Sequence, residues 1–191
     1  DDSTDFKITA EQLKAAITPK TKILLLNTPS NPTGSVYSKE ELLALGEVLK
    51  GTDIIVLSDE MYEKIIYNDK KFTAAAEVSS DMFKRTVTIN GLSKAVAMTG
   101  WRFGYIATPD ASLAKAMTKL QGQVTSNINT MTQYAAIPAL EGDADETIEM
   151  MRVEFEKRKN IAVKSFNEIK GLSTIDPDGA FYLFVNIQEV T

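Results

Sequence analysis

Short apolar runs alternate along the chain with stretches in which apolar and polar residues recur at helical spacing. The runs predict strands because they are short, rich in Ile, Leu, Val and Thr, and bounded by turn residues. The predicted strands are Ile23–Leu26, Ile54–Leu57, Thr86–Ile89 and Arg102–Thr108. Strands separated by helices are typical of an α/β fold, in which a mostly parallel sheet carries helices on both faces.

Start and stop signals define the helices in the first half of the chain. Ser38 and Glu41 form an S-x-x-E capping box, which predicts a helix to about Lys50. Gly51 then ends it. An earlier short helix is predicted over Thr9–Ile17.

The second half of the chain is mainly helical in pattern. A helix is predicted from about Ala111 to Leu140, with a break near 123–129. Asp143–Lys170 predicts a long charged helix that Gly171 ends, and Leu183–Ile187 predicts the first strand of a second sheet. The residues of the long helix expected to contact a core are Ile148, Met151, Phe155, Ile161 and Phe166.

Length and charge narrow the class of protein. The 191 residues suffice for one domain, or for one large domain with part of another. The chain opens on DDSTDFK and closes on the strand-like run FYLFVNIQEVT, so we expect a piece of a longer protein. The apolar runs are too short to cross a bilayer and no signal peptide opens the chain, so a cytoplasmic protein is expected. The net charge of −5 argues against nucleic acid as a partner.

Two residue types are missing from the sequence. It contains no cysteine and no histidine. Disulfides, thiolate nucleophiles, Ser-His-Asp triads and metal sites built from His or Cys are therefore excluded, and no metal site is expected. Acid–base chemistry must fall to Lys, Tyr, Asp, Glu or a bound cofactor.

Polar residues follow three of the predicted strands at the point where each ends. In a parallel sheet the carboxyl ends of the strands share one edge, where ligands bind. Each residue alone has an ordinary explanation, as a turn former, a helix cap, a half-buried aromatic or a solvated charge. Their common placement favours one ligand site. The residues are Asn31 after the first strand, Asp59 and Tyr62 after the second, and Ser93, Lys94 and Arg102 after the third.

The blocks NTPSNPTG, SDEMYE and INGLSKAVAMTGWRFGY resemble the signature blocks of class I/II, fold-type-I aminotransferases, most closely the aspartate-aminotransferase-like branch. The resemblance covers essentially the whole chain. It implies an enzyme that uses pyridoxal 5′-phosphate, bound as a Schiff base on a lysine, to move the amino group of an L-amino acid to a 2-oxo acid, with aspartate the favoured donor. It also implies that residues 1–142 belong to the cofactor-binding large domain, and 143–191 to an interdomain helix and the beginning of a small α+β domain.

The resemblance assigns a role to each residue at the core of the site. Lys94 matches the lysine that forms the Schiff base and later carries a proton; as an amine, it must be deprotonated to attack an aldehyde. Asp59 matches the acid that keeps the pyridine nitrogen protonated. Asn31 and Tyr62 match the donors to the phenolic oxygen, whose ionised form they favour.

Phosphate binding is the second part of the implied site. Arg102 matches the phosphate-binding arginine, because a guanidinium can bind phosphate through two donors at once. Ser93 is expected to add a hydroxyl. Gly91 departs from the family, in which some relatives carry a serine for the same phosphate.

Other parts of a family site are expected outside this chain. The resemblance implies that further phosphate-binding groups and a ring-stacking aromatic precede Asp1, and that an arginine for the substrate α-carboxylate follows Thr191. The chain alone is therefore expected to transaminate weakly or not at all. Family sites are completed in a homodimer, and residues 125–127 (Thr-Ser-Asn) are a candidate for reaching a partner's site.

Three other functions remain open on the sequence alone. The chain could be the aminotransferase-like sensor domain of a transcription regulator, although no basic helix-turn-helix is visible. It could belong to another fold-type-I enzyme, such as a lyase or a cyclopropane-forming synthase, which would differ in the substrate pocket. It could also be a self-associating fragment without a ligand, because half of a sheet would expose strand edges and apolar faces.

Overall fold

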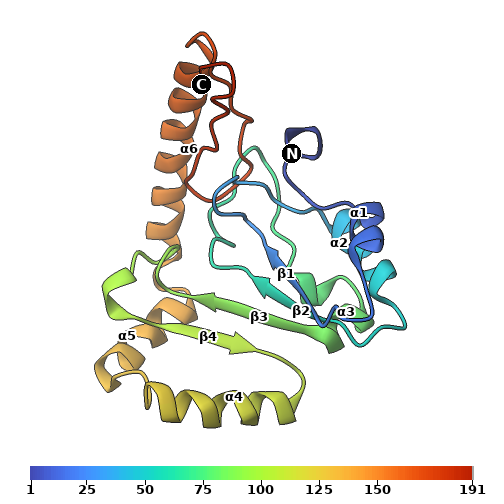
Figure 1. Ribbon diagram of the computed structural model, residues 1–191. Coiled ribbons are helices and arrows are strands. Elements are labelled where there is room, and N and C mark those ends of the chain that lie inside the picture. The colour runs from blue at the N-terminus through green and yellow to red at the C-terminus, as the bar shows by residue number, and fades with distance from the viewer. Residues whose placement is uncertain (191) are drawn as a thin grey trace.

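A single four-stranded sheet organises the chain in the computed structural model, which describes residues 1–190 (Figure 1). The strands β1, β2 and β3 pair in parallel, and β4 pairs antiparallel with β3. The mostly parallel α/β sheet is thus confirmed, and every predicted strand of this sheet is present. In sheet order the strands are β1 (Ile23–Asn27), β2 (Ile55–Asp59), β3 (Thr86–Gly91) and β4 (Gly104–Ala107).

The predicted helices are present as well. Thr9 and Ser38 each cap a helix through a complete capping box, and Gly51 follows the second of these helices with φ +75°. The helix α3 is an addition, because the segment between the second and third strands reads as irregular in sequence. The described α-helices are α1 (Ala10–Ala16), α2 (Lys39–Leu49), α3 (Ser80–Arg85), α4 (Ala111–Val124), α5 (Thr130–Glu141) and α6 (Asp145–Asn167).

The main core lies between one face of the sheet and the helices α1, α2 and α3. Leu26 of β1 and Val56 of β2 point into it, and the apolar side of α2 faces them. Leu42 and Leu49 of α2 are fully buried there. Burying a leucine in this way contributes roughly 1.5–3 kcal/mol, so the α2 face is a principal source of stability for the sheet edge described below.

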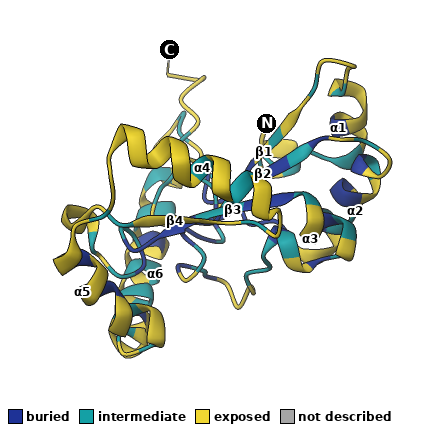
Figure 2. Ribbon diagram, turned by 90° about the horizontal axis from the view of Figure 1, so that it is seen from below, coloured by how far each residue is buried: buried dark blue, intermediate teal, exposed yellow. Residues whose placement is uncertain are grey.

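The opposite face of the sheet is covered only in part among residues 1–190. Ile23 and Leu25 of β1 are 53% and 68% exposed, and Ile106 of β4 is 50% exposed. Figure 2 shows α4 running beside β4 and exposed along most of its length. Apolar residues in such positions mark a surface on which further protein packs.

Two expectations for the C-terminal part are wrong. Residues 183–187 form no strand, since their pairing is one antiparallel bridge between Asn186 and Ser173, and a single bridge builds no ladder. Ile161 of α6 is 67% exposed and contacts no core, whereas Ile148 of the same helix is buried. The predicted boundary between residues 142 and 143 stays a prediction. None of the described helices has both the length and the apolar character needed to cross a membrane.

Glu60 is a buried carboxyl directly after β2. Its side chain accepts hydrogen bonds from Ser58 Oγ at 2.7 Å and from the backbone N–H of Ala75 at 3.1 Å. Burial raises the pKa of Glu60 above its usual value of about 4.5, although the two hydrogen bonds oppose the change. The unfolded chain therefore releases this proton at lower pH than the folded chain, and the contribution of Glu60 to stability is lost as pH rises through the folded pKa.

The substitution Glu60→Gln is expected to gain stability relative to the unchanged chain as pH rises above about 4.5, with a slope of at most about 1.4 kcal/mol per pH unit. Urea unfolding of both proteins from about pH 4 up to neutral pH measures the difference. Glu40→Gln on α2 is the control: backbone hydrogen bonding lowers the pKa of Glu40, so the stability difference for this variant should change only below about pH 4.5, and in the opposite direction. A Glu60→Gln difference that stays flat or falls with pH would contradict the assignment.

Candidate active site

The loops that follow β1, β2 and β3 begin at the same edge of the sheet. Asn27 of β1 pairs with Asp59 of β2, and Asp59 pairs with Ile89 of β3. Because these strands are parallel, the loops that follow them start side by side (Figure 1). The predicted site residues lie in these loops or at these strand ends, so the sheet brings their backbones to one edge.

Asp59 and the loop after β1 are tied together by backbone hydrogen bonds. The carbonyl of Asp59 accepts from the N–H of Thr28 at 3.0 Å and from Asn27 Nδ2 at 3.2 Å. Asn27 Oδ1 in turn accepts the N–H of Asn31 at 2.7 Å. The Asp59 carboxylate caps its own turn by accepting the N–H of Met61 at 3.2 Å. Asn27, which is absent from the predicted set, therefore connects Asn31 to Asp59.

Tyr62 lies in the middle of the group. It is buried, and its hydroxyl contacts the hydroxyl of Tyr182 at 2.6 Å and the side chain of Asn31. Burial, followed by the hydrogen bond with Tyr182 and the negative charge of Asp59, raises the pKa of Tyr62 well above its usual value of about 10, against the opposing effect of Asn31. Tyr62 thus keeps its proton near neutral pH and can act as a donor.

The amine of Lys94 faces aromatic rings. Its Nζ lies 5.7 Å from the ring centroid of Tyr62 and 5.6 Å from that of Phe181, within the range of cation–π attraction. Among residues 1–190 no carboxylate forms an ion pair with it. Such an amine is positioned by packing, which leaves its nitrogen available to a ligand.

Arg102 and Ser93 lie on the two arms of one closed loop. The N–H of Leu92 donates to the carbonyl of Phe103 at 3.3 Å, which joins the ends of the loop. Thr99 braces its interior, donating from Oγ1 to the Ser93 carbonyl at 2.7 Å and accepting from Arg102 Nη1 at 2.9 Å. The Arg102 side chain is exposed, and no hydrogen bond or ion pair joins it to Lys94 or Asp59 within the described residues. The structure thus brings Arg102 to the edge by its backbone alone.

Steric crowding explains why position 91 is a glycine. A Cβ at Gly91 would lie 2.7 Å from the Phe103 carbonyl oxygen and 3.0 Å from Gly104 Cα. Contacts this short force the backbone of β4 to move. A serine, as some relatives are expected to carry here, would not fit this close approach of β3 and β4 without such a shift.

A C-terminal segment that the sequence reading did not assign to the site crosses both loops. The carbonyl of Gly34 accepts the N–H groups of Asp178 and Gly179 at 3.0 and 2.9 Å, and the N–H of Ala180 donates to the carbonyl of Ile65 at 3.0 Å. Residues 178–180 therefore join the loop after β1 to the segment after β2. The DG pair in PDGAFY indicates a turn. The local sequence, however, does not indicate that residues 178–180 bind segments more than a hundred positions away.

Phe181 and Tyr182 follow this crossing and complete an aromatic cluster. The Tyr62 ring makes edge-to-face contacts with Phe181 and Tyr182, with centroids 5.3 and 5.7 Å apart. Phe155 of α6 packs behind Phe181, with centroids 5.2 Å apart. Helix α6 thereby supports the side chains that surround the Lys94 amine.

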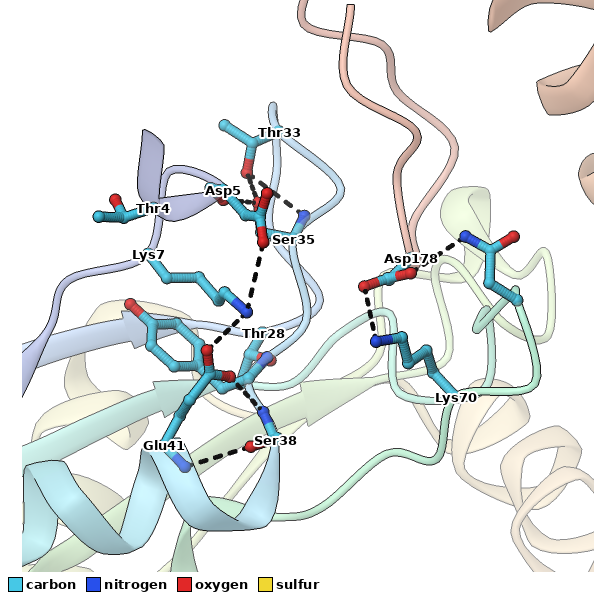
Figure 3. Close-up of polar contacts among 12 residues, drawn as sticks. Thr4, Asp5, Lys7, Thr28, Thr33, Ser35, Ser38, Glu41, Lys70 and Asp178 are labelled. Atoms are coloured by element: carbon cyan, nitrogen blue, oxygen red, sulfur yellow. Dashed lines mark hydrogen bonds and ion pairs between the residues drawn. The ribbon is translucent and has the colours of Figure 1, made fainter. Parts of the chain in front are cut away.

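Charged residues outside the cluster secure the crossing segment. Lys159 of α6 is buried and donates from Nζ to Asn68 Oδ1 at 2.7 Å, while it pairs with Asp176 at the same distance. Figure 3 shows the neighbouring pair of Lys70 and Asp178, whose N···O distance is 3.7 Å. Because Lys159 is buried while Asp176 is exposed, removal of Asp176 would leave the buried ammonium without its ion-pair partner.

The N-terminal residues secure the loop after β1 from its other side (Figure 3). Ser35 Oγ donates to the carbonyl of Asp5. Lys7 Nζ then pairs with Glu41 at 2.7 Å, on the helix that follows the loop. Both ends of the described chain thus restrain the loop that carries Asn31.

Comparison with known proteins gives a consistent result. The sequence model of the family described as "Aminotransferase class I and II" matches residues 1–191. An aspartate aminotransferase of Geobacillus stearothermophilus is 50% identical over 96% of this chain and 46% of its own length. An asparagine–oxo-acid transaminase of Streptococcus mutans is 47% identical over the same shares of both chains. The chain thus spans about half the length of the curated relatives it matches.

Comparison with solved structures leads to the same family. The crystal structure of an aspartate aminotransferase from Rhizobium meliloti superposes with a TM-score of 0.95 at 42% identity, covering all of this chain and 47% of that one. Identity at this level over the whole described fold exceeds what a shared architecture alone would produce. The sheet, the loops at its edge and the sequence blocks in those loops therefore place this chain in the class I and II aminotransferase family.

Proposed function

We propose that this chain carries the pyridoxal 5′-phosphate-binding part of an aminotransferase, which moves the amino group of an L-amino acid to a 2-oxo acid. The observation that supports this best is the position of the Lys94 amine: it lies against the rings of Tyr62 and Phe181, with no carboxylate partner among residues 1–190. It shares its sheet edge with Asp59. The donor groups at this edge fit a phosphorylated pyridine aldehyde, which needs an amine, an acid for the ring nitrogen and donors for the phenolic oxygen.

Each residue has a distinct task in this proposal. Lys94 binds the cofactor covalently and afterwards holds the proton that moves to and from the substrate Cα. The carboxylate of Asp59 pairs with the ring nitrogen and keeps it protonated. Tyr62 and Asn31 donate hydrogen bonds to the phenolic oxygen. The bound cofactor supplies an electron sink for the negative charge that develops at the substrate Cα.

Phosphate binding is proposed for Arg102 and Ser93. The Arg102 guanidinium uses one donor on the Thr99 carbonyl and is otherwise directed to solvent. A guanidinium suits a phosphate dianion because it is always charged and offers paired donors. Ser93 lies one residue from the lysine, so its hydroxyl can contact the same group.

Aspartate is the proposed amino donor, with a 2-oxo acid as acceptor. Two relatives at 50% and 47% identity are named for aspartate and asparagine transamination, and both amino acids have a four-carbon skeleton. Other fold-type-I chemistry and a sensor role, both open on the sequence alone, are not favoured by any feature at this edge.

A homodimer is the proposed assembly. Helix α5 is apolar on most of its circumference, yet it buries only Thr132 and Ala136 within the described chain. Met131 and Tyr134 are 77% and 72% exposed, and Figure 2 shows α5 exposed along most of its length. A helix that is apolar all round is normally buried, so a second copy is expected to cover it. Residues 125–127, in the connection between α4 and α5, would then lie near the partner's site.

A chimeric enzyme tests the proposed activity directly. This chain would replace the aligned 184 residues of the Geobacillus stearothermophilus aspartate aminotransferase. The chimera is expected to transaminate aspartate and 2-oxoglutarate within about tenfold of the parent, whereas the same chimera with Lys94→Ala should lose about 10⁴-fold or more in kcat. The isolated chain should show little or no turnover. A folded chimera that binds pyridoxal phosphate but leaves aspartate unchanged would contradict the proposed function.

A further inference from the structure

Tyr182 contacts the proposed cofactor donor more closely than any other tyrosine does within the described chain. Its hydroxyl lies 2.6 Å from that of Tyr62, and either oxygen can be the donor. The two rings meet edge to face, with an interplanar angle of 82°. Tyr62 is buried, which means that the partner of its hydroxyl decides where its single proton points.

Backbone hydrogen bonds of the residues just before Tyr182 help to fix its position. The N–H of Ala180 bonds the carbonyl of Ile65, and the N–H of Tyr67 bonds the carbonyl of Asp178 at 2.8 Å. The Tyr67 hydroxyl also donates to the Ala180 carbonyl. Residues 65–67 follow Tyr62 closely in the chain. Tyr182 and Tyr62 are therefore carried by two segments that are bonded to each other, and their distance is a built feature of the fold.

We propose that Tyr182 is a positioning residue for the cofactor site, whose hydroxyl orients the Tyr62 hydroxyl toward the phenolic oxygen of bound pyridoxal phosphate. A hydroxyl that accepts a hydrogen bond donates its own proton more strongly, because neighbouring bonds polarise one another. Once the phenolic oxygen of the cofactor accepts the Tyr62 proton, Tyr182 becomes the donor of the pair, which is open to it because either oxygen can donate. This inference rests on the proposed function, since it concerns the same cofactor.

The consequence is measurable without following turnover. A donor to the phenolic oxygen favours its ionised form, so a weaker donor raises the pH at which the visible band of the lysine–cofactor linkage changes. Tyr62→Phe should raise this midpoint most. Tyr182→Phe should raise it in the same direction by about half a pH unit and weaken cofactor binding by about two- to tenfold, the range for one neutral hydrogen bond. Tyr105→Phe, on β4 and outside both the proposed site and the proposed dimer face, is the matched control and should change neither quantity.

The double variant Tyr62→Phe/Tyr182→Phe separates this role from a merely structural one. If Tyr182 acts through Tyr62, the double variant keeps the midpoint of Tyr62→Phe, because no hydroxyl remains to be oriented. Additive shifts, or an unchanged midpoint in Tyr182→Phe while Tyr62→Phe moves, would overturn the role of Tyr182 and leave the proposed function intact. A wild-type chain that forms no band with pyridoxal phosphate would overturn the proposed function, and the role of Tyr182 with it.

Discussion

Replacing Lys94 with alanine is expected to abolish covalent capture of pyridoxal phosphate by the chain. In the proposed site one amine holds the cofactor, and no other lysine lies over the Tyr62 ring among residues 1–190. Without that nitrogen no linkage to the aldehyde can form at this edge, although the phosphate can still bind weakly and reversibly. Borohydride reduction followed by peptide mapping measures the result: the label on the peptide containing Lys94 should fall below about one hundredth of its original amount.

Lys119 provides the control for non-specific capture. It lies on the exposed side of α4, and Lys119→Ala should leave the labelling unchanged. Label on another lysine in the unchanged chain, with Lys94 clean, would show that the site has been assigned to the wrong amine.

Gly34→Ala is expected to destabilise the chain by about 3 kcal/mol. Gly34 has φ +71°, and an alanine there costs about 1–2 kcal/mol for the left-handed backbone. Its Cβ would also lie 2.3 Å from Pro177 Cβ and 2.8 Å from the Gly179 carbonyl oxygen, and such overpacking typically costs about 1–3 kcal/mol. The crossing segment would be pushed off the loop after β1, so the cofactor affinity should fall together with the free energy of unfolding.

Gly51→Ala isolates the backbone part of this effect. Gly51 has a similar φ of +75°, but nothing lies within 4 Å of a Cβ built there. Urea unfolding of both variants should therefore show a loss of only about 1–2 kcal/mol for Gly51→Ala. Equal losses of unfolding free energy for the two substitutions would mean that the clash with Pro177 adds nothing to the cost of Gly34→Ala.

Features that depend on nearby residues could be predicted from the sequence. The capping box of Ser38 and Glu41 gave the start of α2 because it is complete within four positions. The placement of Asn31, Asp59 and Lys94 at one edge followed from the parallel order of three short strands, a general property of α/β sheets. The family's motif then supplied the roles, which remain proposals for this chain.

Features that depend on distant pairing could not be predicted. Tyr182 reaches Tyr62 across 120 positions, and its local sequence reads only as an apolar run after a turn. The run of residues 183–187 had a strand-like pattern, yet it has no neighbouring strand in the described chain with which to form a ladder. Periodicity identifies which residues prefer an extended or helical backbone, but it does not identify their partners.

The crossing of residues 178–180 over both site loops also determines when the site can exist. During synthesis the sheet and its Lys94 loop leave the ribosome well before residue 182, and contacts between distant segments form late because closing a long loop is entropically unfavourable. A nascent chain ending near residue 170 would therefore present the lysine without Phe181 and Tyr182. Loading with the cofactor is thus expected to be a late event in biogenesis, after the last part of the described chain has folded back onto the sheet.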